Sequence, residues 1–211
     1  MPAIALFCSA PLASFRVPQA REYLETLPCP PPSTAYGALL SLVGEIARAR
    51  HAGCQLAYAM LSTPAKSVVL RTAWRVKDLG LLPGVDQNKR PDFQEVLSDV
   101  RLAIWLRPGG AEDAPALADR VAAALHEPGA VTRFGGLALG ESTHLIDELR
   151  ELRSADGDRG RFLVPDDFGT LSLPLWPDHV GSAGTTWVRC RLDERTLEGG
   201  PSNDCWITIA P

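Results

Sequence analysis

The segment RFGGLALGEST, residues 133–143, combines a cation, glycines and hydroxyl side chains in one short stretch. Glycines without a Cβ let backbone N–H groups approach a phosphate or sugar closely, and a guanidinium beside them adds a bidentate charged donor. The hydroxyl and carboxylate groups that follow can bond base edges or 2′-hydroxyls. The segment therefore permits contact with a phosphate, a sugar or a base edge, the alternative being a β-bulge at the start of a strand. Its candidate binding residues are Arg133, Gly135, Gly136, Gly140 and Ser142.

A second group of cations lies between residues 66 and 107. Eight basic residues outnumber five acidic ones there, although the whole chain has a net charge of −4. From residue 141 onward the balance reverses, with seven basic and thirteen acidic residues. The net charge alone argues against a nucleic-acid binder, whereas its distribution indicates a basic middle and an acidic last third. The alternative is ordinary variation of surface charge.

Within this basic middle, successive side chains of residues 65–77 are expected to point to opposite faces of a β-strand. Arg71, Arg75 and Lys77 then share one face. That spacing allows the three cations to contact successive phosphates. Lys89 and Arg90 fall at the tip of a predicted hairpin, where they suit contact with an RNA backbone. The alternative in both cases is a solvated, charged surface.

Cysteine and histidine spacing argues against a metal site. None of the five cysteines forms a C-x-x-C pair, and no motif of a Walker loop or nucleophile elbow occurs. We therefore expect no metal and no cofactor. No apolar run approaches the roughly 20 residues that span a bilayer, and no basic region precedes the short apolar N-terminal stretch. We expect a cytoplasmic protein without membrane contact.

The elements that must position these residues follow from apolar periodicity. The predicted order of the first part is strand, helix, strand, strand, helix, strand, which is typical of ferredoxin-like and RNA-recognition folds of the α+β class. Its first helix begins at a cap on Ser33 or Thr34 and ends near residues 51–53. We predict a ferredoxin-like domain over residues 1–150, with a thumb-like β-hairpin inserted at about 77–98. Residues 151–211 form a β-rich C-terminal extension.

Two motifs carry a resemblance to a known family. PPPSTAYGALLSLVGE (residues 30–45) follows Phe15–Arg16, and RFGGLALGEST comes after the second helix. Together they resemble the fifth family of CRISPR-associated proteins, the subunit that caps the foot of the crRNA-bound Cascade backbone. The resemblance implies that the chain binds the repeat-derived 5′ handle of crRNA. Its implied neighbours are the repeated backbone subunit and the large subunit that inspects target DNA, so that DNA is contacted only indirectly.

The resemblance also adds Arg16 and Tyr36 to the candidate RNA site. Tyr36 can stack on a base, because an aromatic face accepts any base. It can equally begin the apolar stripe of its helix, in which case its ring is buried.

Some members of the resembled family cut the crRNA precursor with a Tyr, a Lys and a His placed together. Tyr36 is a possible counterpart, yet the sequence contains no Lys-His dipeptide, and only His144 lies near the glycine-rich segment. We therefore expect a non-catalytic RNA-binding subunit of an antiviral or guided DNA-targeting complex. The alternatives are a metal-independent endoribonuclease that processes crRNA precursor and a ferredoxin-like interaction domain unrelated to nucleic acid.

Overall fold

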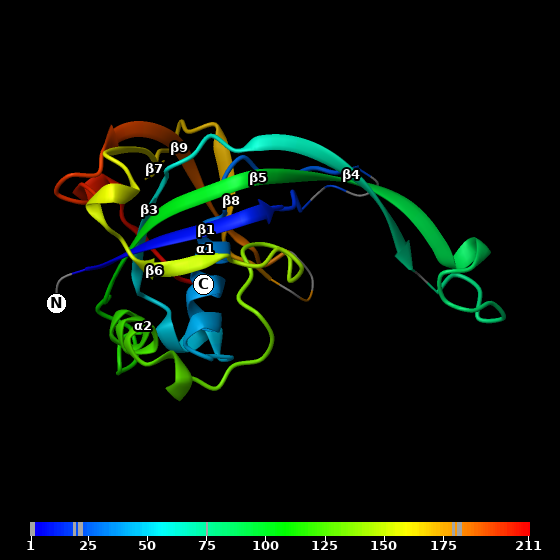
Figure 1. The fold of residues 1–211 in the computed structure, drawn as a ribbon, viewed down its shortest axis with the longest axis horizontal. Helices are drawn as coiled ribbons and strands as arrows, with labels where there is room; N and C mark the ends of the chain where they lie inside the picture. The colour runs from blue at the N-terminus through cyan, green and yellow to red at the C-terminus, as the bar shows by residue number, and fades with distance from the viewer. Residues whose placement is uncertain (1–2, 19, 21–22, 75, 179, 181–182) are drawn as a thin grey trace.

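The computed structural model describes residues 3–18, 20, 23–74, 76–178, 180 and 183–211. The chain forms a mixed α/β molecule in which one large, mostly antiparallel sheet packs against the helices α1 (Pro32–Leu42) and α2 (Leu117–His126). A long hairpin projects from one end of the sheet (Figure 1). No helix among the described residues is long and apolar enough to cross a membrane.

The centre of the sheet is built from strands within residues 4–151. They are β1 (Ile4–Ala13), β3 (Gln55–Met60), β5 (Lys89–Arg107) and β6 (Glu148–Glu151). Their spatial order is β6-β1-β5-β3, and each is antiparallel to its neighbour. Because α1 lies between β1 and β3 in the chain and α2 between β5 and β6, each helix connects strands that are not hydrogen-bonded to each other.

The two faces of this sheet follow the period of two along each strand. In β5, Leu102 and Ile104 belong to the larger apolar core that also contains the buried residues of both helices. Ala103 and Trp105 point to the opposite face, where the Trp105 ring stacks on Phe162 with centroids 5.4 Å apart. Both faces of this part of β5 are therefore covered.

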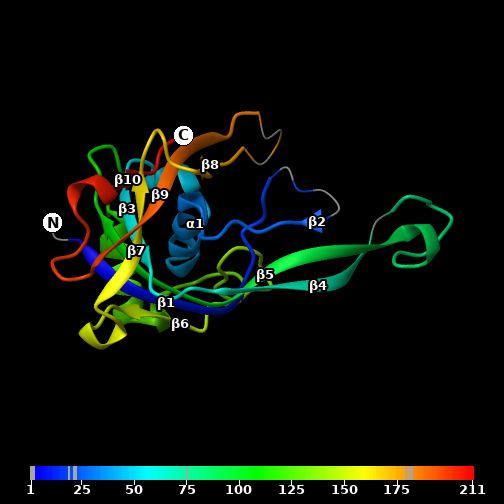
Figure 2. The same cartoon turned by 90° about the horizontal axis from the view of Figure 1, so that it is seen from above.

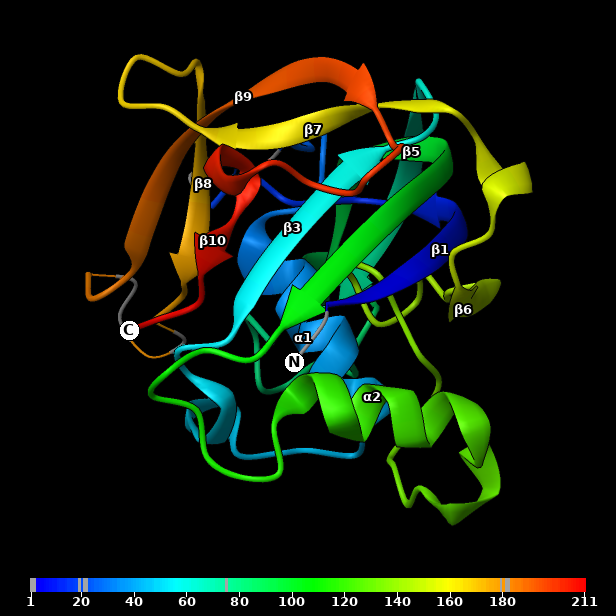
Figure 3. The ribbon, with the colours of Figure 1, turned by 90° about the vertical axis from the view of Figure 1, so that its left-hand side faces the viewer.

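Residues 151–211 supply further strands to the same sheet. They are β7 (Arg159–Pro165), β8 (Leu171–Trp176), β9 (Thr186–Thr196) and β10 (Ile207–Thr208). β7 and β10 pair with different parts of β3, and the sheet continues in the order β7-β9-β8 (Figure 3). Leu173 and Trp176 of β8 are buried in the core that contains α1. The two parts of the chain thus share one sheet and one core, and a domain division at residue 150 stays a prediction.

The projecting hairpin, residues 65–98, is formed by β4 (Ala65–Trp74) and the outer half of β5. Pairing runs without interruption from Ala65 opposite Ser98 to Trp74 opposite Lys89 (Figure 2). The short strand β2 (Tyr23–Leu24) runs parallel to the same part of β5. The hairpin therefore begins earlier than the 77–98 segment expected, because residues 65–74 pair with β5 outside the core sheet.

Helix α1 differs from its prediction at both ends. It begins at Pro32 without a side-chain cap, and the Ser33 hydroxyl instead donates to the carbonyl of Pro174 at 2.8 Å. It ends at Leu42, well before residues 51–53. Gly44, at a φ of +66°, donates to Ser41, and Glu45 donates to Leu40, which is the Schellman pattern that closes a helix. The short 3₁₀ helices are Arg48–His51, Asp86–Asn88, Pro128–Ala130, Ser154–Asp156 and Asn203–Cys205.

Candidate nucleic-acid interface

The glycine-rich segment forms a loop that leads from the 3₁₀ turn at Pro128–Ala130 to β6. It folds back on itself, because the N–H of Leu139 donates to His144 and the N–H of Ile146 donates to Leu137. The Leu139 side chain is fully buried and anchors the loop in the main core. Ser142 is exposed at the turn. The loop is thus fixed at its base and open at its tip.

The three glycines of this loop have different surroundings. Gly140 bridges to Ser14 just beyond β1, and a Cβ there would lie 2.4 Å from the Ser14 carbonyl oxygen. A Cβ on Gly136 would lie 2.9 Å from the Leu145 side chain, whereas one on Gly135 would meet no described atom within 4 Å. Gly140 therefore seats the loop on β1, and Gly135, at a φ of +70°, leaves its backbone open to a ligand.

An ion pair joins the loop to the projecting hairpin. The guanidinium of Arg71 in β4 lies 3.1 Å from the Glu141 carboxylate in the loop. Two segments predicted separately as RNA-binding are therefore neighbours in space. Because Glu141 partly neutralises Arg71, this residue contributes less free charge to the surface than expected from the sequence.

All three lysines of the chain lie in the hairpin. Lys66 pairs with Glu95 at 2.9 Å, whereas the exposed Lys77 and Lys89 have no ion pair among the described residues. The Nε of Arg90 lies 2.9 Å from the Asp92 carboxylate. Arg75 lies outside the described residues. The free cations of the hairpin are therefore found near its tip.

Asn88 organises that tip and was not singled out from the sequence. Its side chain is fully buried. The amide oxygen accepts from the N–H groups of Lys77 and Asp78, both at 2.8 Å, and the amide nitrogen donates to the carbonyl of Leu81 at 2.9 Å. The sequence signal was an Asn within turn-forming text just before Lys89, since Asn side chains commonly bond nearby backbone in turns.

Arg16 and Tyr36 have different accessibility. Arg16 is exposed, and one of its guanidinium nitrogens donates to the carbonyl of Ala20 at 2.9 Å. Tyr36 is only 3% exposed, and its hydroxyl donates to the carbonyl of Arg48. Burial raises the pKa of the Tyr36 hydroxyl. The apolar-stripe interpretation therefore fits Tyr36, and a ring this buried is not open for stacking on a base.

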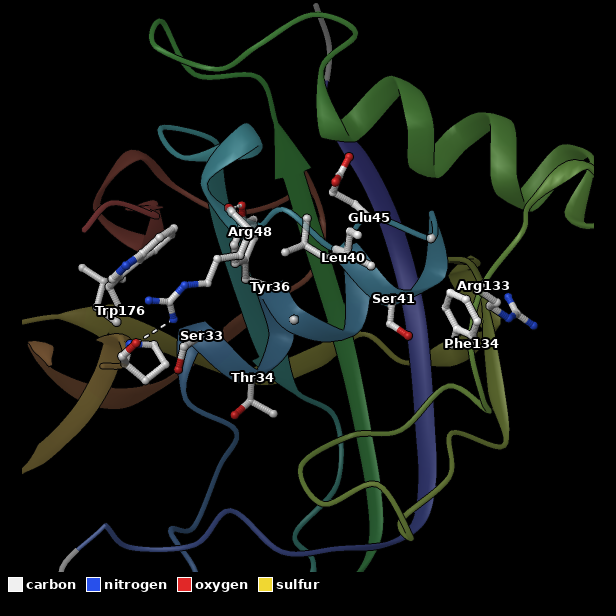
Figure 4. Close-up of a pocket in the computed structure, with 15 residues that line it drawn as sticks. Ser33, Thr34, Tyr36, Leu40, Ser41, Glu45, Arg48, Arg133, Phe134 and Trp176 are labelled. Atoms are coloured by element: carbon white, nitrogen blue, oxygen red, sulfur yellow. Dashed lines mark hydrogen bonds between the residues drawn. The ribbon is translucent and has the colours of Figure 1, made fainter. Parts of the chain in front are cut away.

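A groove runs along the outer side of α1 and has a volume of about 420 Å³ (Figure 4). Arg48 and Trp176 form one end, Phe134 and Arg133 the other, and α1 forms the floor with Gly37. Phe134 is 90% exposed. The groove thus brings together α1, the end of β8 and the beginning of the glycine-rich loop, which are far apart in the sequence.

The histidines form no recognisable catalytic set in the described part of the chain. His51 is fully buried, with Nδ1 3.0 Å from Glu112 and Nε2 2.8 Å from Arg120. Since Arg120 can only donate, Nε2 must accept and Nδ1 carries the proton. Burial lowers the pKa of His51, so the ring is a neutral structural group. His126 is exposed and His179 lies outside the described residues.

His144 is partly buried beside the glycine-rich loop. Its Nδ1 is enclosed and has no hydrogen-bond partner among the described residues. No hydrogen bond joins it to Tyr36 in that part of the chain. Nor do the described residues place three or more His, Cys, Asp or Glu side chains where they could hold a metal ion.

Comparison with known proteins tests the family. No protein-family model matches the chain. A curated relative, the CRISPR-associated protein Cas5 of Myxococcus xanthus (strain DK1622), is 48% identical over 193 residues, which cover 90% of each chain. This chain belongs to the Cas5 family of CRISPR-associated proteins. The resemblance stated from the two sequence motifs is thereby confirmed.

Solved structures support the Cas5-family fold. A chain of a CRISPR RNA-guided surveillance complex has a TM-score of 0.67 at 13% identity, with 97% of this chain and 96% of that one covered. A crystal structure of a Cas protein has a TM-score of 0.53 at 13% identity, with 93% and 95% covered. The likeness extends through residues 151–211, so the C-terminal strands belong to the shared architecture.

Proposed function

We propose that this Cas5-family chain is the non-catalytic subunit of a Cascade-type CRISPR effector complex that holds the 5′ handle of crRNA. The observation that carries the proposal is the ion pair between Arg71 and Glu141, because it places the glycine-rich loop against the root of the projecting hairpin. Membership of the family and a fold like that of a chain in an RNA-guided surveillance complex support it. The strand order β6-β1-β5-β3 with two connecting helices supports a ferredoxin-like core.

The loop and the hairpin offer complementary contacts to a single strand. The open backbone at Gly135 and the hydroxyl of Ser142 suit sugar and phosphate oxygens. Lys77 and Lys89, near the hairpin tip, add cations for phosphates farther along the strand. Arg16 and Arg133 are exposed and can neutralise further phosphates. RNA held in this way would cross from the core of the molecule onto the hairpin.

The hairpin also suits contact with a neighbouring protein subunit. Val68, Leu70 and Trp74 project from one face of β4, and Phe93 of β5 lies opposite Leu70 on that face. The exposed fractions of these four side chains run from 49% for Phe93 to 73% for Trp74. An exposed apolar strip of this kind is typical of a protein interface, and we assign it to the repeated backbone subunit, with the large subunit as the second partner.

The geometry favours a binding subunit over a nuclease. Tyr36 donates its hydroxyl to a backbone carbonyl, and its raised pKa disfavours the phenolate that could act as a base. His51 is held neutral between Glu112 and Arg120. The alternative, a metal-independent endoribonuclease, would have to depend on His144, whose Nδ1 has no partner in the described residues. Incubation of repeat RNA with the purified chain and EDTA tests this: cleavage lost in His144→Ala would establish the nuclease.

Handle binding is tested with a matched pair of glycine variants. Gly135 and Gly199 both have a left-handed backbone, at φ of +70° and +78°, and neither would place a Cβ near any described atom. Gly135→Val and Gly199→Val therefore introduce similar backbone strain at two different places. We expect Gly135→Val to lose binding of RNA that carries the 5′ handle, whereas Gly199→Val retains it. Equal binding by the two folded variants would contradict the assignment of the loop.

A further inference from the structure

The groove over α1 has a lining that suits a nucleotide. Its volume of about 420 Å³ lies within the usual range of small-ligand pockets. Leu40, Leu175, Trp176 and Phe134 supply apolar surface, and the hydroxyl-bearing Ser41 lies among them. The side-chain hydroxyls of Ser41 and of Thr34, another lining residue, have no hydrogen-bond partner among the described residues. Apolar faces combined with a few free polar groups are the usual composition of a base-binding site.

The charges along the groove favour an anionic occupant. Among the described residues that line the groove, Glu45 alone carries a carboxylate. This carboxylate is already paired with Arg120 at 2.5 Å and with Arg50 at 3.2 Å. The hydrogen bond from Arg120 lowers the pKa of Glu45 to about 2, so this carboxylate is ionised and its charge is compensated from outside the groove. The other charged residues that line the groove are Arg48 and Arg133, and neither forms an ion pair with a described carboxylate. The groove is therefore net positive.

One end of the groove is held rigidly before any ligand arrives. The guanidinium carbon of Arg48 lies 4.4 Å from the centre of the Trp176 ring, and its Nη1 donates to the carbonyl of Pro177 at 2.6 Å. The Tyr36 hydroxyl fixes the Arg48 backbone, and the Tyr36 ring lies 6.2 Å from Trp176. Arg48 is thus immobilised as a flat cation facing the groove (Figure 4). Guanidinium planes of this kind stack on unpaired bases.

We propose that this groove is a pocket for one unstacked ribonucleotide of the bound RNA, a proposal that rests on the function proposed above. The base lies between the Arg48–Trp176 end and Phe134, and the hydroxyls of Thr34 and Ser41 bond its edge or its 2′-hydroxyl. Arg133, at the outer rim beside Phe134, is placed for the adjoining phosphate. Because Arg133 opens the glycine-rich loop, the nucleotide would enter from RNA held on that loop.

Gly37 provides a direct way to close the pocket. It lies in the middle of α1 on the groove floor, and a Cβ there would meet no described atom within 4 Å. A larger side chain would therefore extend into the empty groove. Replacing a mid-helix glycine by Ala or Leu also favours the helix, so loss of binding in a Leu variant cannot be attributed to a weakened α1.

The experiment compares Gly37→Leu with Gly37→Ala as the matched control. The dissociation constant for handle RNA is measured by fluorescence anisotropy, for intact RNA and for RNAs that each carry one abasic nucleotide. We expect Gly37→Leu to bind about 5- to 150-fold more weakly than Gly37→Ala, the range for loss of one stacked base. We also expect one abasic position to weaken binding by the Ala variant and to have no further effect in the Leu variant.

The outcomes separate the two proposals. If wild-type protein binds no handle RNA, the proposed function is wrong, and the pocket proposal fails with it. If wild type and both Gly37 variants bind alike, handle binding stands and the nucleotide pocket is wrong. If Gly37→Leu binds weakly but every abasic position keeps its full effect, no single base occupies the groove. That result would overturn the proposal in favour of a different occupant, such as an apolar side chain of a neighbouring subunit.

Discussion

The two halves of strand β5 form a direct comparison, because one continuous strand belongs to two different environments. From residue 102 to 106 it lies between β1 and β3, and both of its faces are covered. From residue 89 to 93 it pairs with β4 in the projecting hairpin and leaves side chains such as Phe93 exposed. The inner half therefore contributes to stability, whereas the outer half presents apolar and basic surface to partners.

The boundary between the halves lies at Asp99, which has a φ of +58°. Asp tolerates this left-handed conformation better than most residues. Around this point the antiparallel partner of β5 changes from β3 to β4, and the Ser62 hydroxyl donates to the Asp99 carbonyl. The strand can thus leave the core sheet without losing its continuity.

The largest expected difference is in stability. Leu102 of the inner half is 0% exposed, and Phe93 of the outer half is 49% exposed. We expect Leu102→Ala to lower the free energy of unfolding by about 2–5 kcal/mol, because it leaves a cavity in a packed core. Phe93→Ala should change it by about 1 kcal/mol at most. Urea unfolding measures both, and similar losses would show that the hairpin supports the fold as strongly as the core does.

A second prediction concerns pH and the buried polar network of the core. The folded state favours neutral His51, so its pKa lies below the ordinary value of 6.5 and the unfolded chain binds more protons. This contribution to stability is complete above pH 6.5 and is lost as the pH falls below it. Protonation of Nε2 would also break the bond from Arg120, a charge-assisted bond of about 1.5–3 kcal/mol.

His51→Asn is the control, since its amide can still donate toward Glu112 but takes up no proton. From pH 7 to pH 5, the urea midpoint of unfolding should fall more for wild type than for the variant. The other charged groups that face His51, Glu112, Arg120 and Glu45, are present in both proteins. An equal fall in the two proteins would assign the pH dependence to groups other than His51.

The smallest expected effect concerns the projecting hairpin alone. If Lys77 and Lys89 each contact a phosphate, replacing both by Ala should reduce the salt dependence of RNA binding by roughly 0.7 of a log unit per contact. Lys66→Ala is the matched control, because Lys66 is paired with Glu95 within the hairpin. Stability should stay unchanged in the Lys77 and Lys89 substitutions. A salt slope equal to that of wild type would mean that the tip lysines are only solvated.

The sequence predicted much of the fold where periodicity was strong. The predicted first helix is present, although it begins at Pro32 without the cap expected on Ser33 or Thr34, and the family was identified correctly from residues 30–45 and 133–143. The end of α1 was placed too late, because apolar spacing continues past Gly44 and does not reveal the Schellman turn there. The first residues of the hairpin were likewise predicted as an ordinary strand.

The candidate site depended more strongly on tertiary contacts. Periodicity places Tyr36 on a helix face, but only the packing of β8 and Arg48 against that face decides that its ring is buried. Charge counts identify Arg71 as basic, but only the approach of the loop pairs it with Glu141. The sequence by itself determined the family, the core strands and the residue types available for binding RNA. Which of those residues remain free was decided by the tertiary structure, because pairing and burial depend on neighbours distant in the chain.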